Sequence, residues 1–477
     1  MPRCDDFSFD ELARVTGGVW LDLPPPTVPG ITTVTDTTCD LPSGALFVAI
    51  RGERTDGHEY LPAAIAAGAG AVCVDGRELG ADTLAALRAA AVPRLRVNDT
   101  LSAFQELARA HRLRFPQLMV VAITGSCGKT STKEMLAAVL ERRYPGAVLR
   151  TEGNTNNHFG VPRNLLRLTP EHAGAVLELG SNHPGEIAGL VRLVEPQIAV
   201  VSNIGRSHLK YFVNEAGVAR EKGAIFSRLP ADGTAVYPAN AKHADILRTR
   251  AGVHRQVTFA DAGAKADLCV EYLGPRDAAF EVKLFQPATG AAVVFAWGIG
   301  GAHQACNAGA VAAVGTVLGV PLERIGAALA GCRLPEKRME IREVEGVFWF
   351  NDAYNSNPDS AAASVSWFAE LTAKAPPTDC ALVLGDMLEQ NEAEQQTLHL
   401  ELLRQARQRF PAAVIVPVGK LMTAAAGEIG GFRAFPDAAS AKPYVLSLLK
   451  PGFRILLKGS HGIHLDTLLP GAAKPQR

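Results

Sequence analysis

The chain has 477 residues, of which 47% are apolar and 20% are charged, and its 48 lysines and arginines balance 48 aspartates and glutamates. At roughly 150 residues per domain, this length predicts about three domains of ordinary globular composition. The zero net charge gives no electrostatic support to a nucleic-acid or anionic-membrane partner, and we expect neither.

The N-terminal stretch and the cysteines indicate a cytoplasmic protein. "MPRCDDFSFDELARVTGG" carries acidic residues where a secretory signal needs an apolar core. The longest apolar run, residues 308–322, is too short and too rich in glycine to span a bilayer, which takes about 20 residues. The eight cysteines form no C-x-x-C pair, so neither a zinc knuckle nor a disulfide framework is expected.

Short strand-like runs and a helix of small residues occupy the first segment, residues 1–115. The runs are "GALFVAI" and "GAVCV", and "YLPAAIAAGAG" lies between them as a helical stretch. A longer helical pattern, "LSAFQELARAHRLRF", closes the segment before a proline. This pattern predicts a small N-terminal α/β domain.

Apolar strands alternate with helical patterns through residues 116–333. The strands are "LMVVAIT", "GAVLELG" and "PQIAVVSNIG", and the run at 308–322 is expected to be a buried helix that ends near Gly319. Such alternation predicts a parallel sheet covered by helices. We expect a central domain of the P-loop ATPase type.

The same style returns in residues 334–477, with "VFWFND", "CALVLGD", "AVIVPVG" and "RILLKGS". Glycine or aspartate stands at the end of each strand, where open α/β sheets bind ligands. This segment predicts a Rossmann-like C-terminal domain. The expected fold class is therefore α/β in three domains, with boundaries near 115/116 and 333/334.

One glycine loop carries the clearest functional signal. In "VVAITGSCGKTSTKE" a β-branched strand runs into Gly125 and Gly128, which allow tight turns with inward N–H groups. Lys129 adds a positive charge and Thr130 a hydroxyl for Mg²⁺, ahead of a helical pattern. An isoleucine stands where the general phosphate-loop pattern has its first glycine. The loop predicts a nucleoside triphosphate site, and a plain strand–helix turn is the alternative.

"TGSCGKTSTKE" resembles the shortened phosphate loop of the Mur ligase family, ATP-dependent amide-forming enzymes of peptidoglycan synthesis. Further blocks match in chain order: "GNTNNHFGVP", "ELGSNHPGEI", "NIGRSHL", "REKGAIF", "HQACNAGAVAA" and "NDAYNSNPDS". "LGDMLE" and "KGSHG" match near the C-terminus, so the resemblance covers nearly the whole chain. "DAYNSNPDS" and "ELGSNHPGEI" look most like the branch that adds D-alanyl-D-alanine.

The resemblance implies an ADP-forming acid–amino-acid ligase. It would join D-alanyl-D-alanine to the carboxyl end of UDP-N-acetylmuramoyl-tripeptide through an acyl phosphate. The implied cofactors are ATP and Mg²⁺ at two sites, and the implied partners are these small molecules, with a monomeric chain. The first domain would bind the UDP-sugar, the second ATP and the third the amine donor.

The resemblance implies four catalytic residues: Lys129, Glu178, His208 and Lys222. Glu178 ends an apolar strand and offers the oxygen that Mg²⁺ prefers, although a surface acid is the alternative. His208 is a poor match for Mg²⁺ by chemistry, so only the resemblance makes it a metal ligand beside Thr130 and Glu178. Lys222 matches the lysine that the family carbamylates, a change that turns an ammonium into an anion and needs a lowered pKa.

The remaining implied residues bind ATP or the other substrates. For ATP they are Gly125, Ser126, Cys127, Gly128, Lys129, Thr130, Ser131, Asn307, Arg338 and Asp352. For the other substrates they are Asp36, Thr37, Asp56 and His58 near the uridine diphosphate, Asn156, Asn157 and Ser181 near the muramoyl peptide, and Tyr354, Asn355 and Lys458 in the C-terminal segment.

Three positions depart from the family pattern. Cys127 replaces the usual asparagine, and a thiol at a helix N-terminus is expected to have a lowered pKa and to be alkylated before the other cysteines. Thr38 replaces an arginine and cannot supply its charge to the diphosphate. His461 replaces an arginine in "KGSHG" and changes the expected dipeptide recognition.

Two alternative functions stay open. One is a different Mur-type ligase, or a ligase like folylpolyglutamate synthase, with another amino-acid substrate. The other is a catalytically inactive nucleotide-binding scaffold. The joint presence of Glu178, His208 and Lys222 argues against the scaffold.

Overall fold

The computed structural model describes residues 7–22, 30–52, 55–276 and 279–471. These residues form three sheets, of five, nine and five strands. The contacts divide the chain into two compact units. One unit holds residues 1–122, 146–180 and 188–196, and the other holds 123–145, 181–187 and 197–477. In the described part of the chain, every helix is too short or too polar to cross a bilayer.

The first sheet has the strand order β1-β5-β4-β3-β2, with β1 as its antiparallel edge. Its elements are α1 (Phe9–Thr16), β1 (Val19–Trp20), β2 (Val34–Thr35), β3 (Leu46–Val48), η1 (Gly57–Tyr60), α2 (Leu61–Ala66), β4 (Ala71–Val74), α3 (Ala81–Ala89), β5 (Arg94–Arg96) and α4 (Thr100–Leu113). Two of these helices, α1 and α4, begin where the sequence supplies a capping oxygen: Ser8 accepts from the Glu11 N–H, and Asp99 accepts from the Ser102 N–H.

The nine-stranded sheet has the order β14-β13-β12-β11-β10-β9-β6-β8-β7. Its first part consists of β6 (Met119–Thr124), α5 (Lys129–Glu141), β7 (Val148–Arg150), α6 (Gly160–Leu165), β8 (Gly174–Glu178), α7 (Glu186–Val194), β9 (Ile198–Val201), α8 (Leu209–Phe212), α9 (Glu215–Gly223), η2 (Ala224–Arg228), β10 (Thr234–Pro238), α10 (Ala244–Ala251) and β11 (Arg255–Asp261). Neighbouring strands from β9 to β12 run parallel, as the alternation of strands and helices predicts.

Beyond β11 the sheet continues as an antiparallel meander, which the sequence analysis did not anticipate. It consists of β12 (Leu268–Arg276), β13 (Ala279–Phe285) and β14 (Ala292–Trp297), followed by α11 (Ala302–Val317) and α12 (Leu322–Ala330). In β13 every second side chain is buried, as expected for a strand with one covered and one more open face. The alternation in "AFEVKLF" carried this signal. The buried helix expected in residues 308–322 is confirmed as part of α11.

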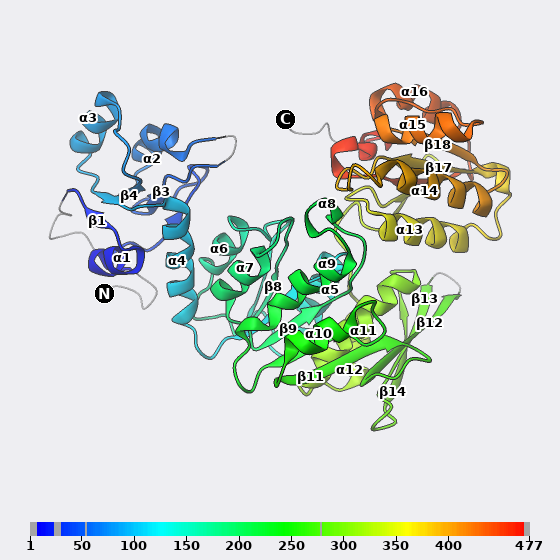
Figure 1. Ribbon diagram of the computed structural model, residues 1–477, viewed down its shortest axis with the longest axis horizontal. Coiled ribbons are helices and arrows are strands. Elements are labelled where there is room, and N and C mark those ends of the chain that lie inside the picture. Colours follow the sequence, from blue (N-terminus) through cyan, green and yellow to red (C-terminus); the bar gives the residue numbers. More distant parts are fainter. Residues whose placement is uncertain (1–6, 23–29, 53–54, 277–278, 472–477) are drawn as a thin grey trace. The chain divides into compact units, whose positions relative to one another are not determined.

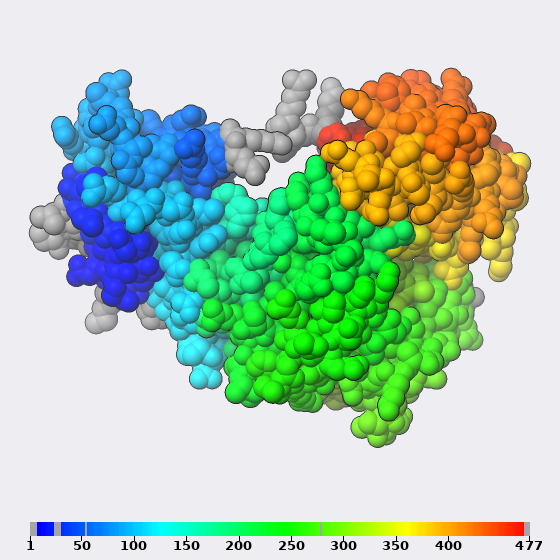
Figure 2. Space-filling model, viewed as in Figure 1, coloured from blue at the N-terminus to red at the C-terminus, as the bar shows by residue number. Residues whose placement is uncertain are grey.

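The third sheet has the order β15-β16-β19-β17-β18, and only β15 is antiparallel to its neighbour. Its elements are β15 (Glu340–Val344), β16 (Val347–Asn351), α13 (Pro358–Leu371), η3 (Pro377–Asp379), β17 (Cys380–Gly385), α14 (Gln395–Arg409), β18 (Val414–Val418), α15 (Lys420–Ile429), α16 (Ala438–Ser447), β19 (Arg454–Lys458), η4 (His461–Ile463) and η5 (Leu465–Leu468) (Figure 1). In Figure 2 the helices α15 and α16 lie at the surface in orange. The three-domain α/β fold class is confirmed, whereas the exact domain boundaries stay predictions.

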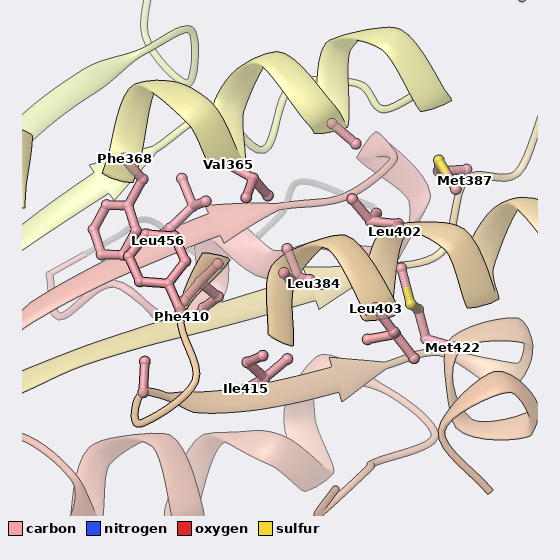
Figure 3. Packing of buried hydrophobic residues seen from close by; sticks show 14 of the residues in the cluster. Val365, Phe368, Leu384, Met387, Leu402, Leu403, Phe410, Ile415, Met422 and Leu456 are labelled. Atoms are coloured by element: carbon pink, nitrogen blue, oxygen red, sulfur yellow. The ribbon is translucent and has the colours of Figure 1, made fainter. Parts of the chain in front are cut away.

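Two apolar clusters hold the third sheet between its helices. The first joins α13, α14 and α15 to one face, and the second joins α16 and η5 to the other. Figure 3 shows the first cluster, in which Phe368 of α13 faces Phe410 beside Leu456 of β19. The ring centroids of Phe368 and Phe410 are 5.3 Å apart, and Phe350 meets Phe368 edge-on at 5.0 Å. Phe368 therefore packs α13 against β16 and β19.

Replacing Phe368 with alanine is expected to lower the free energy of unfolding by about 3–5 kcal/mol, because a fully buried ring would leave a cavity. Urea unfolding of the full chain, followed by tryptophan fluorescence, measures the change. Leu446→Ala in α16 is the matched control. Because that leucine is 39% exposed, the free energy of unfolding should fall far less. Equal losses in the two variants would contradict the assignment of Phe368 to the core.

Candidate active site

The glycine loop between β6 and α5 is a tight cradle. Gly125 and Gly128 have φ values of 154° and 76°. A Cβ atom on Gly125 would lie 2.1 Å from the Ser202 Oγ, and one on Gly128 would lie 2.3 Å from the Asn307 Oδ1. Both positions therefore require glycine for packing as well as for backbone geometry. The plain-turn alternative does not explain this close enclosure.

Side chains of the following strand and loop hold the cradle in shape. Asn203 Oδ1 accepts the Cys127 N–H at 2.8 Å, and Ser202 Oγ donates to the Cys127 carbonyl at 2.7 Å. Ser126 Oγ donates to the Gly205 carbonyl at 3.1 Å and accepts the Gly205 N–H at 3.0 Å. The sequence analysis assigned only His208 in this "NIGRSHL" block and missed its part in fixing the loop.

Lys129 and Thr130 begin α5 directly after the cradle. The Lys129 Nζ donates to the Gly125 carbonyl at 2.8 Å, so its charge lies on the loop itself. Thr130 is buried, and its Oγ1 accepts from Arg338 Nη2 at 3.0 Å. Arg338 also stacks on the Tyr354 ring, with 3.9 Å between the guanidinium carbon and the ring centroid. Two residues predicted from distant blocks thus meet at the phosphate loop.

A chain of amides from α11 reaches the first turn of α5. Asn307 Nδ2 donates to Gln304 Oε1 at 3.0 Å, and Gln304 Nε2 lies 3.5 Å from Ser131 Oγ. Asn307 was predicted to meet adenine, and here its amide packs against Gly128. His303, which the sequence analysis did not single out, lies 3.0 Å from the Met339 sulfur, and burial lowers its pKa to about 4.

Asp352, which is half-buried, and the buried Lys458 form an ion pair at the carboxyl ends of β16 and β19. The Lys458 Nζ lies 2.6 Å from Asp352 Oδ2 and donates to the Asn355 carbonyl at 3.0 Å. Ser364 also donates to Asp352. Asp352 was predicted to bind ATP and Lys458 another substrate, and the structure brings the two together.

Lys222 is enclosed, with a side chain only 1% exposed. Its Nζ donates to Ser181 Oγ at 2.8 Å and lies 5.7 Å from the centroid of the Phe212 ring. Burial, reinforced by the positive charge of Lys129, lowers the pKa of the Lys222 ammonium to about 7. The neighbouring Glu221 carboxylate accepts the N–H groups of Gly185 and Ile187 instead. An amine of this kind is neutral often enough at physiological pH to react with CO₂.

His208 stands at a left-handed backbone position, with φ of 51°, just before α8. Its Nδ1 lies 3.6 Å from Glu389 Oε2. Burial, with the charges of Lys222 and Lys129, lowers the pKa of His208 to about 3. The imidazole is therefore neutral at physiological pH and keeps a lone pair for a ligand.

The other unit carries Glu178 and the two predicted asparagines. Glu178 is buried at the end of β8, and its Oε1 accepts from Asn156 Nδ2 at 2.7 Å. Asn157 Oδ1 accepts the N–H groups of Phe159 and Gly160, at 3.2 and 2.9 Å, and so starts α6. The structure therefore joins Asn156 to the predicted metal ligand and gives Asn157 a local structural contact.

The predicted uridine-diphosphate residues are all held by neighbouring side chains. His58 Nδ1 lies 2.8 Å from Asp56 Oδ1, and Arg77 binds both Asp56 and Asp75. Burial raises the pKa of Asp56, but the bonds from His58 and Arg77 outweigh it and bring that pKa to about 2.

Asp36 accepts two hydrogen bonds from Arg163, while Thr37 Oγ1 accepts the Cys39 N–H at 3.1 Å. The sequence analysis missed Arg77 and Arg163. Neither lies in a block that was assigned a charge-binding role.

The expectation of a lowered pKa for Cys127 is wrong. Burial raises the pKa of the Cys127 thiol, and the hydrogen bond from Asn357 Nδ2, 2.9 Å from the sulfur, lowers it only in part. The prediction considered only the helix N-terminus next to Cys127. It could not include Asn357, which contacts the thiol from 230 positions away in the sequence.

Alkylation by iodoacetamide is expected to reach Cys127 after the exposed Cys39, because Cys127 is only partly exposed and a thiol with a raised pKa is a weak nucleophile. Quenched time points followed by peptide mass spectrometry measure each rate on the folded chain. Labelling after unfolding in urea is the control, since the two thiols should then react alike. Faster labelling of Cys127 in the folded chain would contradict its enclosure.

No cluster of three or more His, Cys, Asp or Glu side chains that could hold a metal occurs in the described part of the chain. Mg²⁺ commonly keeps several waters and uses one or two carboxylates together with substrate phosphates. Thr130, Glu178 and His208 supply a hydroxyl, a carboxylate and an imidazole, of which the first two suit Mg²⁺. A site completed by nucleotide phosphates is compatible with this donor set.

Models of one family match most of the chain. Models described as "Mur ligase family, catalytic domain", "Mur ligase middle domain" and "Mur ligase, glutamate ligase domain" match residues 31–112, 123–315 and 337–461. The chain is 37% identical over 441 residues to the UDP-N-acetylmuramoyl-tripeptide–D-alanyl-D-alanine ligase of Escherichia coli (strain K12), covering 91% of this chain and 92% of that protein. It is 32% identical over 459 residues to the Bacillus subtilis (strain 168) ligase of the same name, with 91% and 92% covered.

Solved structures agree with this placement. The chain matches a crystal structure of MurF from Acinetobacter baumannii with a TM-score of 0.86 and 31% identity, over 97% of this chain and 98% of that one. It matches the Thermotoga maritima MurF ligase in complex with ADP with a TM-score of 0.77 and 23% identity, over 91% and 96% of the two chains. The second match supports the fold.

Proposed function

The chain belongs to the Mur ligase family, and from this membership we propose that it joins D-alanyl-D-alanine to the carboxyl end of UDP-N-acetylmuramoyl-tripeptide. ATP would be converted to ADP and phosphate. The observation that carries the proposal is the enclosed cradle at Gly125 and Gly128, with Lys129 on it and Arg338 bound to Thr130. A loop of this kind suits a triphosphate. The chain also aligns over about nine-tenths of the length of relatives that bear this ligase's name.

The reaction requires activation of a carboxylate, because hydroxide is too poor a leaving group for direct attack by an amine. We propose that the tripeptide carboxylate attacks the terminal phosphorus of ATP, which breaks the bond to ADP and forms an acyl phosphate. The amine of D-alanyl-D-alanine then attacks the carbonyl carbon and loses a proton. The tetrahedral intermediate expels inorganic phosphate and leaves the amide.

The chain's own residues would align and neutralise the phosphates. Backbone N–H groups of the loop and the N-terminus of α5 favour an anion. Lys129 would exchange its bond to the Gly125 carbonyl for a phosphate oxygen. Because Ser126, Ser202 and Asn203 already fix the loop, little reorganisation is needed when the nucleotide binds.

Mg²⁺ would be held by Thr130, Glu178 and His208 together with the nucleotide, in two sites. When bound, it neutralises charge on the transferring phosphoryl group. Asn156 would orient the Glu178 carboxylate, since it donates to Oε1. His208 is neutral and so carries no charge that would repel a cation.

Carbamylation of Lys222 extends the same proposal. The neutral amine adds to the carbon of CO₂, a new N–C bond forms, and one proton leaves, so the product is an anionic carbamate. The lowered pKa and the hydrogen bond to Ser181 support such a reaction. A buried anion next to Lys129 and a metal site would be better stabilised than the buried ammonium it replaces.

Each of the three segments would bind a different substrate. We assign the UDP-sugar to residues 1–115, with Asp36, Thr37, Asp56 and His58 in its pocket. ATP and metal fall to residues 116–333, and the amine donor falls to residues 334–477, with Tyr354, Asn355 and Lys458. We further propose that the protein acts in the cytoplasm as a monomer.

Mass spectrometry of the reaction product tests the function. The purified chain is mixed with ATP, Mg²⁺, D-alanyl-D-alanine and UDP-N-acetylmuramoyl-tripeptide, in versions ending in lysine and in diaminopimelate. The pentapeptide product is expected only when every component is present. A different accepted amino acid in a parallel panel would indicate another Mur-type or folylpolyglutamate-synthase-like ligase. Phosphate release that never depends on an acceptor would favour the inactive scaffold.

A further inference from the structure

Arg163 and Asp36 form a two-pronged ion pair across 127 residues of sequence. The Arg163 Nε donates to Asp36 Oδ1 at 2.8 Å, and its Nη2 donates to Asp36 Oδ2 at 2.7 Å. Such a fork-to-fork arrangement fixes the plane of the guanidinium as well as its position. Both residues belong to the same compact unit of the structure.

The pair is asymmetric in its access to solvent. The Asp36 side chain is only 5% exposed, whereas the Arg163 side chain is 48% exposed. Both carboxylate oxygens of Asp36 are already taken, so this residue has little to offer a ligand directly. The bonds to Asp36 use Nε and Nη2 of Arg163, so the N–H groups of Nη1 are not needed for this pair.

Asp36 would disfavour an anionic substrate unless its charge were balanced. A nearly buried carboxylate beside a diphosphate is repulsive in a region of low dielectric constant. Thr38, two residues along, carries no charge to offset it. Arg77 is committed to Asp56 and Asp75, and Arg51, whose backbone pairs with Asp56, is exposed. Arg163 differs from both in that two hydrogen bonds fix it to Asp36, within the segment Thr35–Thr38.

The helix that carries Arg163 is firmly attached. α6 follows directly on the loop of Asn156 and Asn157, and Gln105 of α4 donates to the His158 carbonyl at 3.0 Å. Phe159 and Leu166, which flank the helix, pack against the apolar cluster of the first sheet. The backbone that carries Arg163 is thus held by packing on both sides, and the two bonds to Asp36 fix the guanidinium.

We infer that Arg163 is a further substrate-binding residue, whose guanidinium, oriented by Asp36, binds the diphosphate of the nucleotide-sugar substrate and supplies the positive charge that Thr38 lacks. The inference rests on the proposed function, since it names a group that would recognise that same substrate. It also changes the role predicted for Asp36, from a direct ligand to the residue that positions Arg163.

Binding of UDP and of uridine tests the inference, because the two probes differ only in the diphosphate. Arg163→Ala is expected to weaken UDP binding roughly tenfold to a hundredfold, the usual range for a lost hydrogen bond to a charged group, and to leave uridine binding unchanged. Each dissociation constant is measured by ligand-observed NMR titration on the full chain. The KM for UDP-N-acetylmuramoyl-tripeptide should rise in parallel, with the KM for ATP unaltered.

Three further variants separate charge from structure. Arg192→Ala removes another ion pair of the same unit, Arg192 with Glu106 at 2.7 Å. It should leave the dissociation constants for both UDP and uridine unchanged. The dissociation constant of Arg163→Lys for UDP should lie between those of the wild type and Arg163→Ala. An ammonium cannot form the bidentate pair with Asp36 and still face a phosphate in the same way. Adding Thr38→Arg to Arg163→Ala places an arginine where the family usually has one and should restore part of the UDP affinity.

The inference is overturned if Arg163→Ala binds UDP as the wild type does, or if UDP and uridine weaken equally, which would indicate a disturbed pocket. Absence of recovery with Thr38→Arg would also refute the charge assignment. The proposed function fails separately, if the wild type forms no pentapeptide product. In that case the comparison of UDP with uridine still decides whether Arg163 binds a diphosphate.

Discussion

Lys129→Met is expected to lower the rate of product formation by roughly 100-fold to 1,000-fold, the range seen when one preorganised group that stabilises transition-state charge is removed. Methionine keeps the length of the side chain but removes the ammonium, which lies 2.8 Å from the Gly125 carbonyl in the cradle. The loss should appear mainly in kcat, because charge on the transferring phosphoryl group is greatest in the transition state. Coupled detection of ADP with all substrates present measures it.

Lys450→Met is the control for Lys129→Met. That lysine is exposed, pairs with Asp379 at the surface, and should leave the rate within about twofold of the wild type, as surface pairs contribute little. Thermal unfolding of both variants checks that the fold is retained. A folded Lys129→Met protein with a normal kcat would remove the phosphate loop from the mechanism.

Lys222→Met is expected to abolish turnover and, unusually for a catalytic substitution, to stabilise the fold near neutral pH. The loss of turnover follows from the proposed carbamate, which methionine cannot form. Ligation rates measured in CO₂-depleted buffer and in bicarbonate test this part. The wild type should gain activity with bicarbonate and the variant should not. Normal activity of the variant without bicarbonate would rule out a role for a carbamate.

The gain in stability follows from the depressed pKa of Lys222. Its folded-state pKa is about 7 against the ordinary 10.5, so below pH 7 the amine is charged in both states and the folded state bears the full penalty of a buried charge. Between pH 7 and 10.5 the unfolded chain holds a proton that the folded chain lacks, and wild-type stability therefore rises with pH. The variant lacks this dependence on pH. At pH 6.5 its free energy of unfolding should exceed that of the wild type by on the order of a few kcal/mol.

Thermal melts of both proteins in CO₂-depleted buffer at pH 6.5 and 9 measure the slope. Lys210→Met is a suitable control, because that lysine is exposed and pairs with Glu392. The control should follow the wild type at both pH values. A Lys222→Met protein that melts below the wild type at pH 6.5 would show that the ammonium is not buried at a penalty.

Local patterns in the sequence were enough for most of the fold. The β-branched runs became β6, β8 and β9, and the glycine loop became a cradle in front of α5. These features depend on neighbours within a few residues, so a pattern in the chain contains them. The antiparallel meander was missed, although the alternation in β13 was visible, because the βα rhythm before it was extended too far.

The electrostatics of the site depend on distant residues and could not be read in the same way. "REKGAIF" looks like an exposed helix, yet Lys222 is buried because Ser181 and Phe212 enclose it. The pairing of Asp36 with Arg163 spans 127 positions, and no local pattern connects them. The wrong expectation for Cys127 has the same origin, since its environment is completed by Asn357.

The enclosure of Cys127 bears on inhibitor design. A cysteine in a loop that we propose binds nucleotide invites electrophilic inhibitors, but a thiol with a raised pKa that accepts from the Asn357 amide offers them little thiolate. A compound that competes for that amide, and so replaces a weak sulfur acceptor with a good oxygen acceptor, would gain selectivity without a covalent bond. Because Asn357 also caps α13, such a compound would couple drug binding to the anchoring of that helix.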